Sequence, residues 1–274
     1  MTRSLLSHWP EYLIEGALLA LFMVVAVNVT ALLEHPSSPA AGLITDPNLR
    51  RAVIGLAMGV TAVALIYSPW GQRSGAHMNP ATTLSFLRLG KIQRADAFLY
   101  VAAQFAGGAG GILLFKLFLP GVIAHPSVQY VVTVPGTPGV AVAFLAEAII
   151  SCGMMLMVLF ATNSRRYAPY TGWFAGGLVF LYITFEAPLS GMSINPARTF
   201  ASAFPSGIWT AGWIYFIAPA LGMLLAVEAF SAFKRAIACP KYFHGTSQRC
   251  IFCGYPGKSV EPAGCKVGAP AATH

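Results

Sequence analysis

The sequence carries one short polar motif twice, each time between long apolar segments. Residues 74–83 read SGAHMNPATT and residues 190–199 read SGMSINPART, with Ser, Gly, Asn, Pro, Ala and Thr at matching positions. This agreement without a gap predicts an internal repeat. Asparagine is a favoured helix N-cap, and proline suits the first helical position because its missing N–H needs no partner there. Each motif therefore predicts a helix start, at Asn79, Pro80 and Ala81 and again at Asn195, Pro196 and Ala197.

A pair of such helix starts could form a selective pathway for small molecules rather than a catalytic site. The helices that follow, Ala81 to Leu89 and Ala197 to Phe204, are about nine residues or roughly 13 Å long, half of a bilayer core. If they meet N-terminus to N-terminus, their partial positive charges repel cations, including hydronium. Each asparagine can cap its helix with the side-chain carbonyl and direct an amide N–H at a passing oxygen. A water molecule held in this way donates outward in both directions, which interrupts a proton wire.

The composition identifies the medium in which these helices must lie. The 274 residues are 56% hydrophobic and only 9% charged, against about 25% charged in a soluble domain. This excludes most soluble enzymes, disordered proteins and disulfide scaffolds, and it predicts a multi-pass membrane protein. The net charge of +8 lies mostly in short loops beside apolar segments, so it does not indicate nucleic-acid binding.

Apolar periodicity predicts six membrane helices, near 12–33, 52–70, 95–119, 140–161, 170–188 and 209–232. The first is too long for a signal peptide and is expected to be retained. Most Lys and Arg residues fall on the side of the two termini, which predicts cytoplasmic termini. We expect the protein in the plasma (inner) membrane. We expect a channel domain over 1–234, with repeats at about 11–120 and 140–234 that enter the membrane from opposite sides, and a cytoplasmic tail over 235–274.

Over about residues 11–232 the sequence closely resembles the aquaporin and aquaglyceroporin family, also called major intrinsic proteins. The resemblance rests on the two motifs, on Glu15 and Glu147 in the first and fourth helices, and on Ala103-Gln104 in the third. It implies an all-α fold with six transmembrane helices and two re-entrant half-helices in an inverted 3+3 repeat. It also implies a passive channel for water and small neutral solutes, without enzyme activity or a cofactor, that assembles as a homotetramer in the bilayer.

The resemblance also implies a second constriction, the aromatic/arginine filter. Its arginine follows the second motif and is Arg198, and ungapped counting from each Asn gives Gly59, Ile183 and Met192 for the other positions. A shift of one residue would place Met58 or Val60 at the first of these positions. The alternative for Arg198 is a buried arginine paired with Glu186. A strict water channel of the family would have an aromatic residue at the first position and His at the second. The filter is therefore expected to be wide and apolar, which favours solutes such as glycerol or urea.

Other positions resemble the water channels of the family and leave a strict water-selective channel open as an alternative. Glycerol channels of the family typically have Asp directly after the filter Arg and a basic residue four positions later. This chain has Thr199 and Ala203 there, and helix six carries Tyr215-Phe216, an aromatic pair typical of water channels.

The membrane carboxylates Glu15 and Glu147 could instead carry protons, which would make the chain a proton-coupled secondary transporter. The resemblance implies a structural role, in which they hold the loops behind the half-helices by hydrogen bonds. His77 is expected to support the same region or to line the cytoplasmic vestibule, rather than to bind a metal.

The tail contains Cys239, His244, Cys250 and Cys253. Three thiolates and an imidazole suit tetrahedral zinc, and the short CxxC spacing suits one end of such a site. The alternative is a set of reduced cytosolic thiols. A third class of function, a membrane-anchored metal or redox sensor with a non-conducting pore, would depend on this tail alone.

Overall fold

The computed structural model describes residues 2–233, 239–241 and 250–255, and these residues form helices and no strands. Six helices are long and apolar enough to cross a membrane: His8–Glu34, Pro47–Tyr67, Arg94–Phe118, Val140–Thr162, Ala168–Ser190 and Ile214–Phe233. The predicted count of six spans is confirmed, and the ends differ from the prediction by a few residues.

The spans and their connections have the following bounds. The long helices are α1 (Thr2–Glu34), which has a kink at His8, α3 (Pro47–Tyr67), α6 (Arg94–Phe118), α8 (Val140–Thr162) and α12 (Ile214–Phe233). The fifth span comprises η2 (Ala168–Tyr170), α9 (Thr171–Leu181), the π-helical turn η3 (Tyr182–Glu186) and α10 (Ala187–Ser190). Short connecting helices are α2 (Pro39–Leu43), α4 (Pro69–Ser74), α7 (Pro120–Ala124) and η1 (Gln129–Val131).

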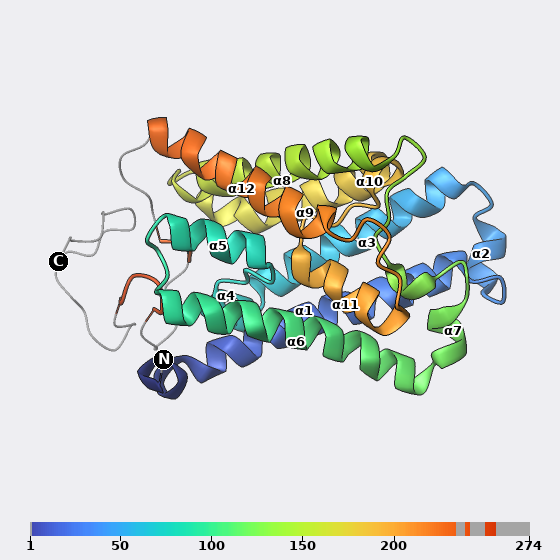
Figure 1. The fold of residues 1–274 in the computed structure, drawn as a ribbon, viewed down its shortest axis with the longest axis horizontal. Coiled ribbons are helices and arrows are strands. Elements are labelled where there is room, and N and C mark those ends of the chain that lie inside the picture. Colours follow the sequence, from blue (N-terminus) through green and yellow to red (C-terminus); the bar gives the residue numbers. More distant parts are fainter. Residues whose placement is uncertain (1, 234–238, 242–249, 256–274) are drawn as a thin grey trace.

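Two short helices, α5 (Pro80–Arg88) and α11 (Pro196–Ser206), begin at the repeated motifs. Both have Asn as the N-cap and Pro as the first residue, as the local sequence preference predicts. Figure 1 shows them between the long helices, near the middle of the molecule, with the start of α1 and the end of α12 at the same end. Their positions are those expected for half-helices. The even number of spans accounts for the two ends of the helical domain lying on the same side.

Small residues allow the long helices to approach closely. A Cβ atom added at Gly107 in α6 would lie 2.1 Å from the Gly16 carbonyl oxygen of α1, and one at Gly222 in α12 would lie 2.2 Å from the Ala148 carbonyl oxygen of α8. Only glycine fits these contacts, as is common between membrane helices. The pairs α1/α6 and α8/α12 occupy equivalent places in the two repeats, so each repeat is built around one tight helix pair.

Candidate transport pathway

The N-termini of α5 and α11 are capped by the asparagine side chains of the two motifs. Asn79 Oδ1 accepts the Ala81 N–H at 2.9 Å. Asn195 Oδ1 accepts the N–H groups of Ala197 and Arg198 at 3.0 and 3.2 Å. The side-chain carbonyls thus satisfy helix donors that would otherwise lack a partner, and each amide nitrogen is directed away from its own helix.

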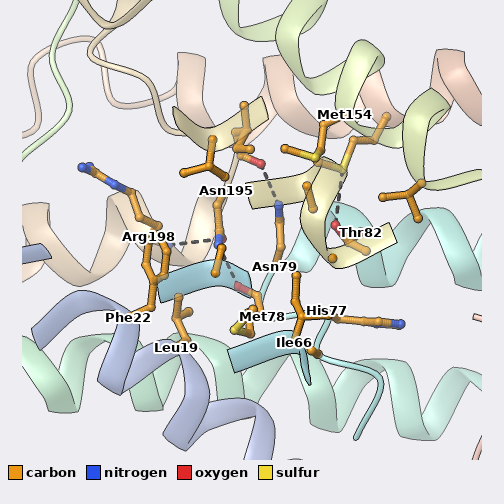
Figure 2. A pocket seen from close by; sticks show the side chains of 18 of the residues that line it. Leu19, Phe22, Ile66, His77, Met78, Asn79, Thr82, Met154, Asn195 and Arg198 are labelled. Atoms are coloured by element: carbon orange, nitrogen blue, oxygen red, sulfur yellow. Dashed lines mark hydrogen bonds between the residues drawn. The ribbon is translucent and has the colours of Figure 1, made fainter. Parts of the chain in front are cut away.

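The two amide nitrogens link the motifs to each other. Asn79 Nδ2 donates to the Ile194 carbonyl oxygen, and Asn195 Nδ2 donates to the Met78 carbonyl oxygen, both at 2.7 Å. Figure 2 shows the two asparagines facing one another across the junction. Each NH₂ group has two hydrogens, so one holds the opposite repeat and the second remains to bind an oxygen in the cavity.

The loops before the half-helices have matching left-handed backbone. Ala76 and Met78 have φ of 48° and 46°, and the equivalent Met192 and Ile194 have φ of 52° and 49°. Such conformations cost non-glycine residues about 1–3 kcal/mol each and persist only where the surroundings hold them. The Met78 and Ile194 carbonyls that accept the asparagine amides belong to these strained residues, so the surrounding structure must fix them.

The Glu15 carboxylate supplies this fixation in the first repeat. Its Oε1 accepts the Ser74 hydroxyl at 2.7 Å and the His77 N–H at 3.0 Å. Its Oε2 accepts the Met78 N–H at 2.6 Å and the Gln104 amide at 2.9 Å. Glu15 is fully buried, and all four bonds use the carboxylate as an acceptor, which suits the ionised form.

Glu147 performs the equivalent function in the second repeat. Its Oε1 accepts the Ser190 hydroxyl at 2.9 Å and the Ser193 N–H at 2.6 Å, and its Oε2 accepts the Ile194 N–H at 2.8 Å. It is fully buried and does not line the cavity. The two carboxylates therefore bind the strained loops from behind in the same way, and the structural role that the family resemblance implied stays a prediction.

A cavity of about 210 Å³ passes both asparagines. Its lining runs from Arg198 and Ile183 on one side of the motifs to His77 and Pro240 on the side of the chain termini. Most of the wall between them is apolar and comes from α1, α3, α8 and α9. Against such a wall, a few polar side chains can bind a passing solute. Besides the asparagine amides and the arginine, they are His77, Thr82, Thr162, Thr171 and Ser193.

The structure corrects one of the four filter residues. Gly59 does not line the cavity, whereas Met58, Ile183 and Met192 do. A Cβ atom at Gly59 would lie 2.5 Å from the Gly176 carbonyl oxygen, so this residue faces α9 in a tight helix contact. Counting back from Asn79 without a gap selected the wrong helix face, since one residue turns an α-helix by about 100°. Met58, 2% exposed, lines the cavity instead; it is one of the two residues that a shift of one position in the count selects.

Arg198 lies in the first turn of α11 and borders the cavity. Its Nη1 is buried and has no hydrogen-bond partner among the described residues. None of the salt bridges in the described part of the chain joins it to Glu186. Figure 2 shows its side chain extending away from the asparagine pair. The guanidinium is thus available to a solute oxygen at a second point along the pathway.

The residues that resemble strict water channels lie behind the cavity wall. Thr199 shares hydrogen bonds with Thr133 at 2.8 Å and Ser193 at 2.6 Å. The Tyr215 hydroxyl donates to the Ser190 carbonyl oxygen at 2.5 Å. Ala203 is 2% exposed, and the Phe216 ring stacks on Phe105 with centroids 6.3 Å apart. None of Thr199, Ala203, Tyr215 and Phe216 lines the cavity, so their contacts position the loop and half-helix.

His77 lines the cavity on the side of the termini and has aromatic neighbours on both faces. Its Nδ1 lies 3.0 Å from the Thr83 hydroxyl, and its ring stacks between Phe86 and Phe252 at centroid distances of 5.1 and 5.2 Å. No cluster of potential metal ligands in the described residues includes it. Phe252 comes from the tail, and no sequence pattern indicated this contact.

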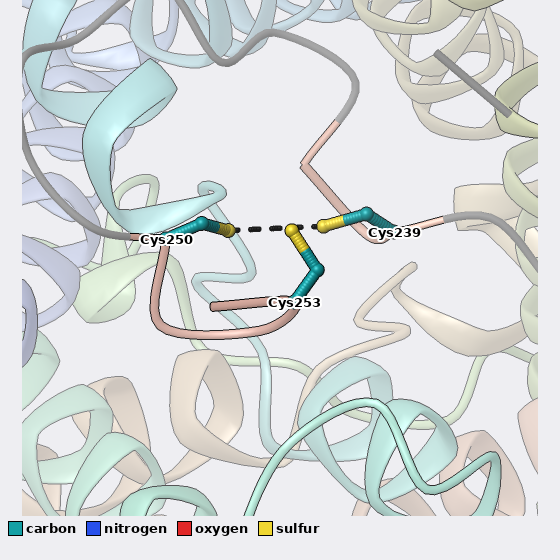
Figure 3. A group of neighbouring side chains, drawn as sticks. All are labelled: Cys239, Cys250 and Cys253. Carbon is teal, nitrogen blue, oxygen red and sulfur yellow. Dashed lines mark hydrogen bonds between the residues drawn. The ribbon is translucent and has the colours of Figure 1, made fainter. Parts of the chain in front are cut away.

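The described part of the tail packs against the channel and gathers three cysteines. The sulfur atoms of Cys239, Cys250 and Cys253 lie within 4.8 Å of one another, as Figure 3 shows. His244, the fourth ligand expected from the sequence, lies outside the described residues. Burial lowers the pKa of Lys241, while the neighbouring thiols of Cys250 and Cys239 oppose this effect.

Comparisons with known proteins agree with this architecture. The sequence profile of the family described as "Major intrinsic protein" matches residues 5–230. Aquaporin NIP2-2 of Zea mays is 36% identical over 201 residues, which cover 72% of this chain and 66%, just under two thirds, of that protein. Aquaporin TIP4-3 of Zea mays is 32% identical over 226 residues, covering 81% of this chain and 87% of that protein.

A solved structure shares the fold. The X-ray structure of the aquaglyceroporin from Plasmodium falciparum superposes with a TM-score of 0.67, at 19% sequence identity, over 82% of this chain and 96% of that chain. At this identity the likeness establishes the fold alone. Together with the match over residues 5–230, the paired motifs and the six apolar helices, it leads to one conclusion: the chain belongs to the major intrinsic protein family and is a membrane channel rather than an enzyme.

Proposed function

We propose that this channel conducts water and small uncharged solutes such as glycerol or urea passively, and that it excludes protons and ions. The observation that carries the proposal is the wall around Arg198. Met58, Ile183 and Met192 line the cavity with this arginine, and none of the three is aromatic or can donate a hydrogen bond. Unbranched Met side chains adapt to irregular shapes, so this constriction can accept a carbon-bearing solute whose hydroxyls bind the arginine.

The half-helix junction supports the exclusion of protons and cations. The N-termini of α5 and α11 face each other through reciprocal asparagine bonds, and each adds about half a positive charge. A solute oxygen at this point accepts hydrogen bonds from the amides, so a water molecule there has both of its own hydrogens directed away. The Arg198 charge adds a second electrostatic barrier along the same cavity.

A strict water channel is the alternative within the family. Three of the residues that favour it, Thr199, Ala203 and Tyr215, are buried behind the wall. Phe216 does not line the cavity either, so none of the four has a direct means of rejecting glycerol. Met58 in place of the expected Gly59 does narrow the filter, and this favours the alternative. A glycerol measurement decides between the two.

A proton-coupled transporter has less support. Each carboxylate that would carry the proton is fully buried and accepts at least three hydrogen bonds. Protonating Glu15 or Glu147 would set a donor against the backbone N–H groups that hold the loop. Flux that saturates and follows a pH gradient would support the transporter, whereas flux proportional to the osmotic gradient supports the channel.

The setting of the channel is also part of the proposal. The excess of Lys and Arg on the side of the termini supports cytoplasmic termini, and we propose that the protein lies in a plasma (inner) membrane. We expect a homotetramer with one pathway in each subunit, and exposed apolar side chains such as Leu145, Ile149 and Phe185 are available to lipid or to neighbouring subunits. Conduction requires no cofactor, but we propose that the cysteines of the tail hold a zinc ion.

Stopped-flow light scattering of proteoliposomes in a glycerol gradient tests the proposed function. Initial shrinkage reports water permeability and later reswelling reports glycerol permeability. Acceleration of both phases over empty vesicles, with a low activation energy, is the expected result. Acceleration of shrinkage alone would replace the proposal with the strict water channel, and acceleration of neither would end it.

A further inference from the structure

The described tail residues cover the termini-side mouth of the cavity, which we define as the part bordered by His77 and Pro240. Pro240 itself lines the cavity. The Lys241 ammonium donates to the Arg73 carbonyl oxygen at 3.1 Å. Ile251 is 8% exposed and belongs to an apolar cluster with Phe86 and other residues of this mouth. These contacts attach two separate tail segments, 239–241 and 250–255, to the channel.

Phe252 does not itself line the cavity, but it packs on His77, which does. Its ring stacks on His77 at 5.2 Å with an interplanar angle of 24°, and it meets Tyr100 edge-on at 6.2 Å. A Cβ atom added at Gly75 would lie 2.8 Å from this ring, so the loop before the first motif leaves room for it only because that residue is glycine. With Phe252 in place, His77 is only 6% exposed.

The cysteine cluster joins the two tail segments beside this mouth. Cys239 comes from the first segment, and Cys250 and Cys253 come from the second (Figure 3). The sulfurs of Cys239 and Cys250 are 3.8 Å apart. Two thiolates on a tetrahedral zinc, each about 2.3 Å from the metal, have a separation of about 3.8 Å. The Cys239–Cys250 pair thus already has the spacing of two zinc ligands, and the Cys253 sulfur lies within 4.8 Å of both.

The backbone and charges around the cluster also suit a cation. The Gly254 N–H donates to the Cys250 carbonyl oxygen at 2.9 Å, and the Cys250 N–H donates to the Tyr255 carbonyl oxygen at 2.8 Å. These bonds close a tight turn that places both sulfurs of the CxxC segment on one side. Three thiolates and Zn²⁺ have a net charge of minus one, and Lys241, two residues after Cys239, supplies a compensating positive charge.

We propose that Zn²⁺ bound by Cys239, Cys250 and Cys253 locks the two tail segments together, so that Phe252 closes the termini-side mouth over His77. Removing the ion releases the tail and opens the mouth. The proposal rests on the proposed channel function. A ligand that binds only the closed form raises the closed-to-open ratio about 100-fold when its free concentration is 100 times its dissociation constant.

The test uses the full chain in proteoliposomes, kept reduced, with buffered free Zn²⁺ or with a zinc chelator. We expect one zinc per chain by elemental analysis and a fall in osmotic water permeability when zinc is present. The Cys250→Ser/Cys253→Ser variant should lose the zinc and conduct equally well in both buffers. The matched control Cys152→Ser, whose thiol lies in α8 away from the cluster, should behave as the wild type.

The Phe252→Ala variant distinguishes zinc binding from closure of the termini-side mouth. It keeps all three ligands and should bind one zinc, yet its permeability should stay high with and without the ion. Equal zinc content in the wild type and the double cysteine variant would overturn the site. One bound zinc with unchanged wild-type permeability would overturn the closure. Wild-type vesicles that conduct no faster than empty ones in chelator would refute the proposed channel function instead.

Discussion

The Gly59→Ala substitution distinguishes two possible positions of this residue, in the wall of the filter or at the contact between α3 and α9. If Gly59 lined the filter, a methyl group would narrow the pathway and leave the helices in place. In the structure the added Cβ atom would lie 2.5 Å from the Gly176 carbonyl oxygen and 3.3 Å from the Phe180 Cβ atom. The nearest atom is backbone, which cannot rotate aside, so α3 and α9 must separate. We expect a less stable protein whose selectivity is unchanged.

The size of the effect follows from two opposing contributions. Overpacking a tight contact costs about 1–3 kcal/mol, whereas Gly to Ala within a helix gains up to about 1 kcal/mol. Gly177→Ala in α9 isolates the second contribution, since nothing lies within 4 Å of a Cβ atom there. The difference between the two variants should therefore be about 1–3 kcal/mol, equivalent to roughly 5- to 150-fold in the unfolding equilibrium.

Equilibrium unfolding in mixed micelles gives the stability difference, and stopped-flow measurements give the ratio of glycerol to water permeability. Gly59→Ala should fall below Gly177→Ala in stability while the permeability ratio stays at the wild-type value. Met58→Ala, which shortens a side chain in the cavity wall, should raise the ratio. A Gly59→Ala protein as stable as Gly177→Ala, with lowered glycerol permeability, would refute the placement of Gly59 at the helix contact.

Three further substitutions test other parts of the pathway. Glu147→Gln replaces one acceptor oxygen by a donor that faces the Ser193 region, so it should lower stability by about 1–3 kcal/mol. Unchanged unfolding with loss of pH-driven uptake would instead favour the transporter. Tyr215→Phe removes the hydrogen bond to the Ser190 carbonyl and should lower stability by about 1 kcal/mol. The ratio of glycerol to water permeability should be unchanged, and a raised ratio would show that this residue contributes directly to selectivity. Arg198→Ala should raise glycerol permeability and admit small cations, which are measured as conductance in planar bilayers. An unaltered ratio of glycerol to water permeability and no conductance would contradict the role of Arg198 as a filter and a barrier to cations.

Local sequence preferences were sufficient to predict the helix starts and the membrane spans, because both depend on residues that are close in the sequence. The starts of α5 and α11 follow from the preference of Asn for the N-cap and of Pro for the first turn. The six spans follow from length and apolar composition. The glutamate contacts agree with what the family resemblance implied, because an ionised buried carboxylate needs several donors and the loop N–H groups lack helical partners.

Other features depend on contacts that spacing does not encode. Fixed counting from Asn79 assumed a constant connection, but α4, Pro69–Ser74, lies between the helix and the motif, and one residue of difference exchanges Met58 for Gly59. The contact between Phe252 and His77 joins the tail to the first repeat through shape alone. No periodicity or motif predicts a contact of this kind.

The reciprocal asparagine bonds also constrain the order in which the protein can be assembled. The partner of Asn79 is the carbonyl of Ile194, 115 residues later in the chain, so a nascent chain containing only the first repeat has no acceptor for that amide. Until the second repeat has entered the membrane, the strained loop at Met78 has its bonds to Glu15 but lacks the Asn195 amide. Because long-range closure is slow, we expect the centre of the pathway to form last during biosynthesis.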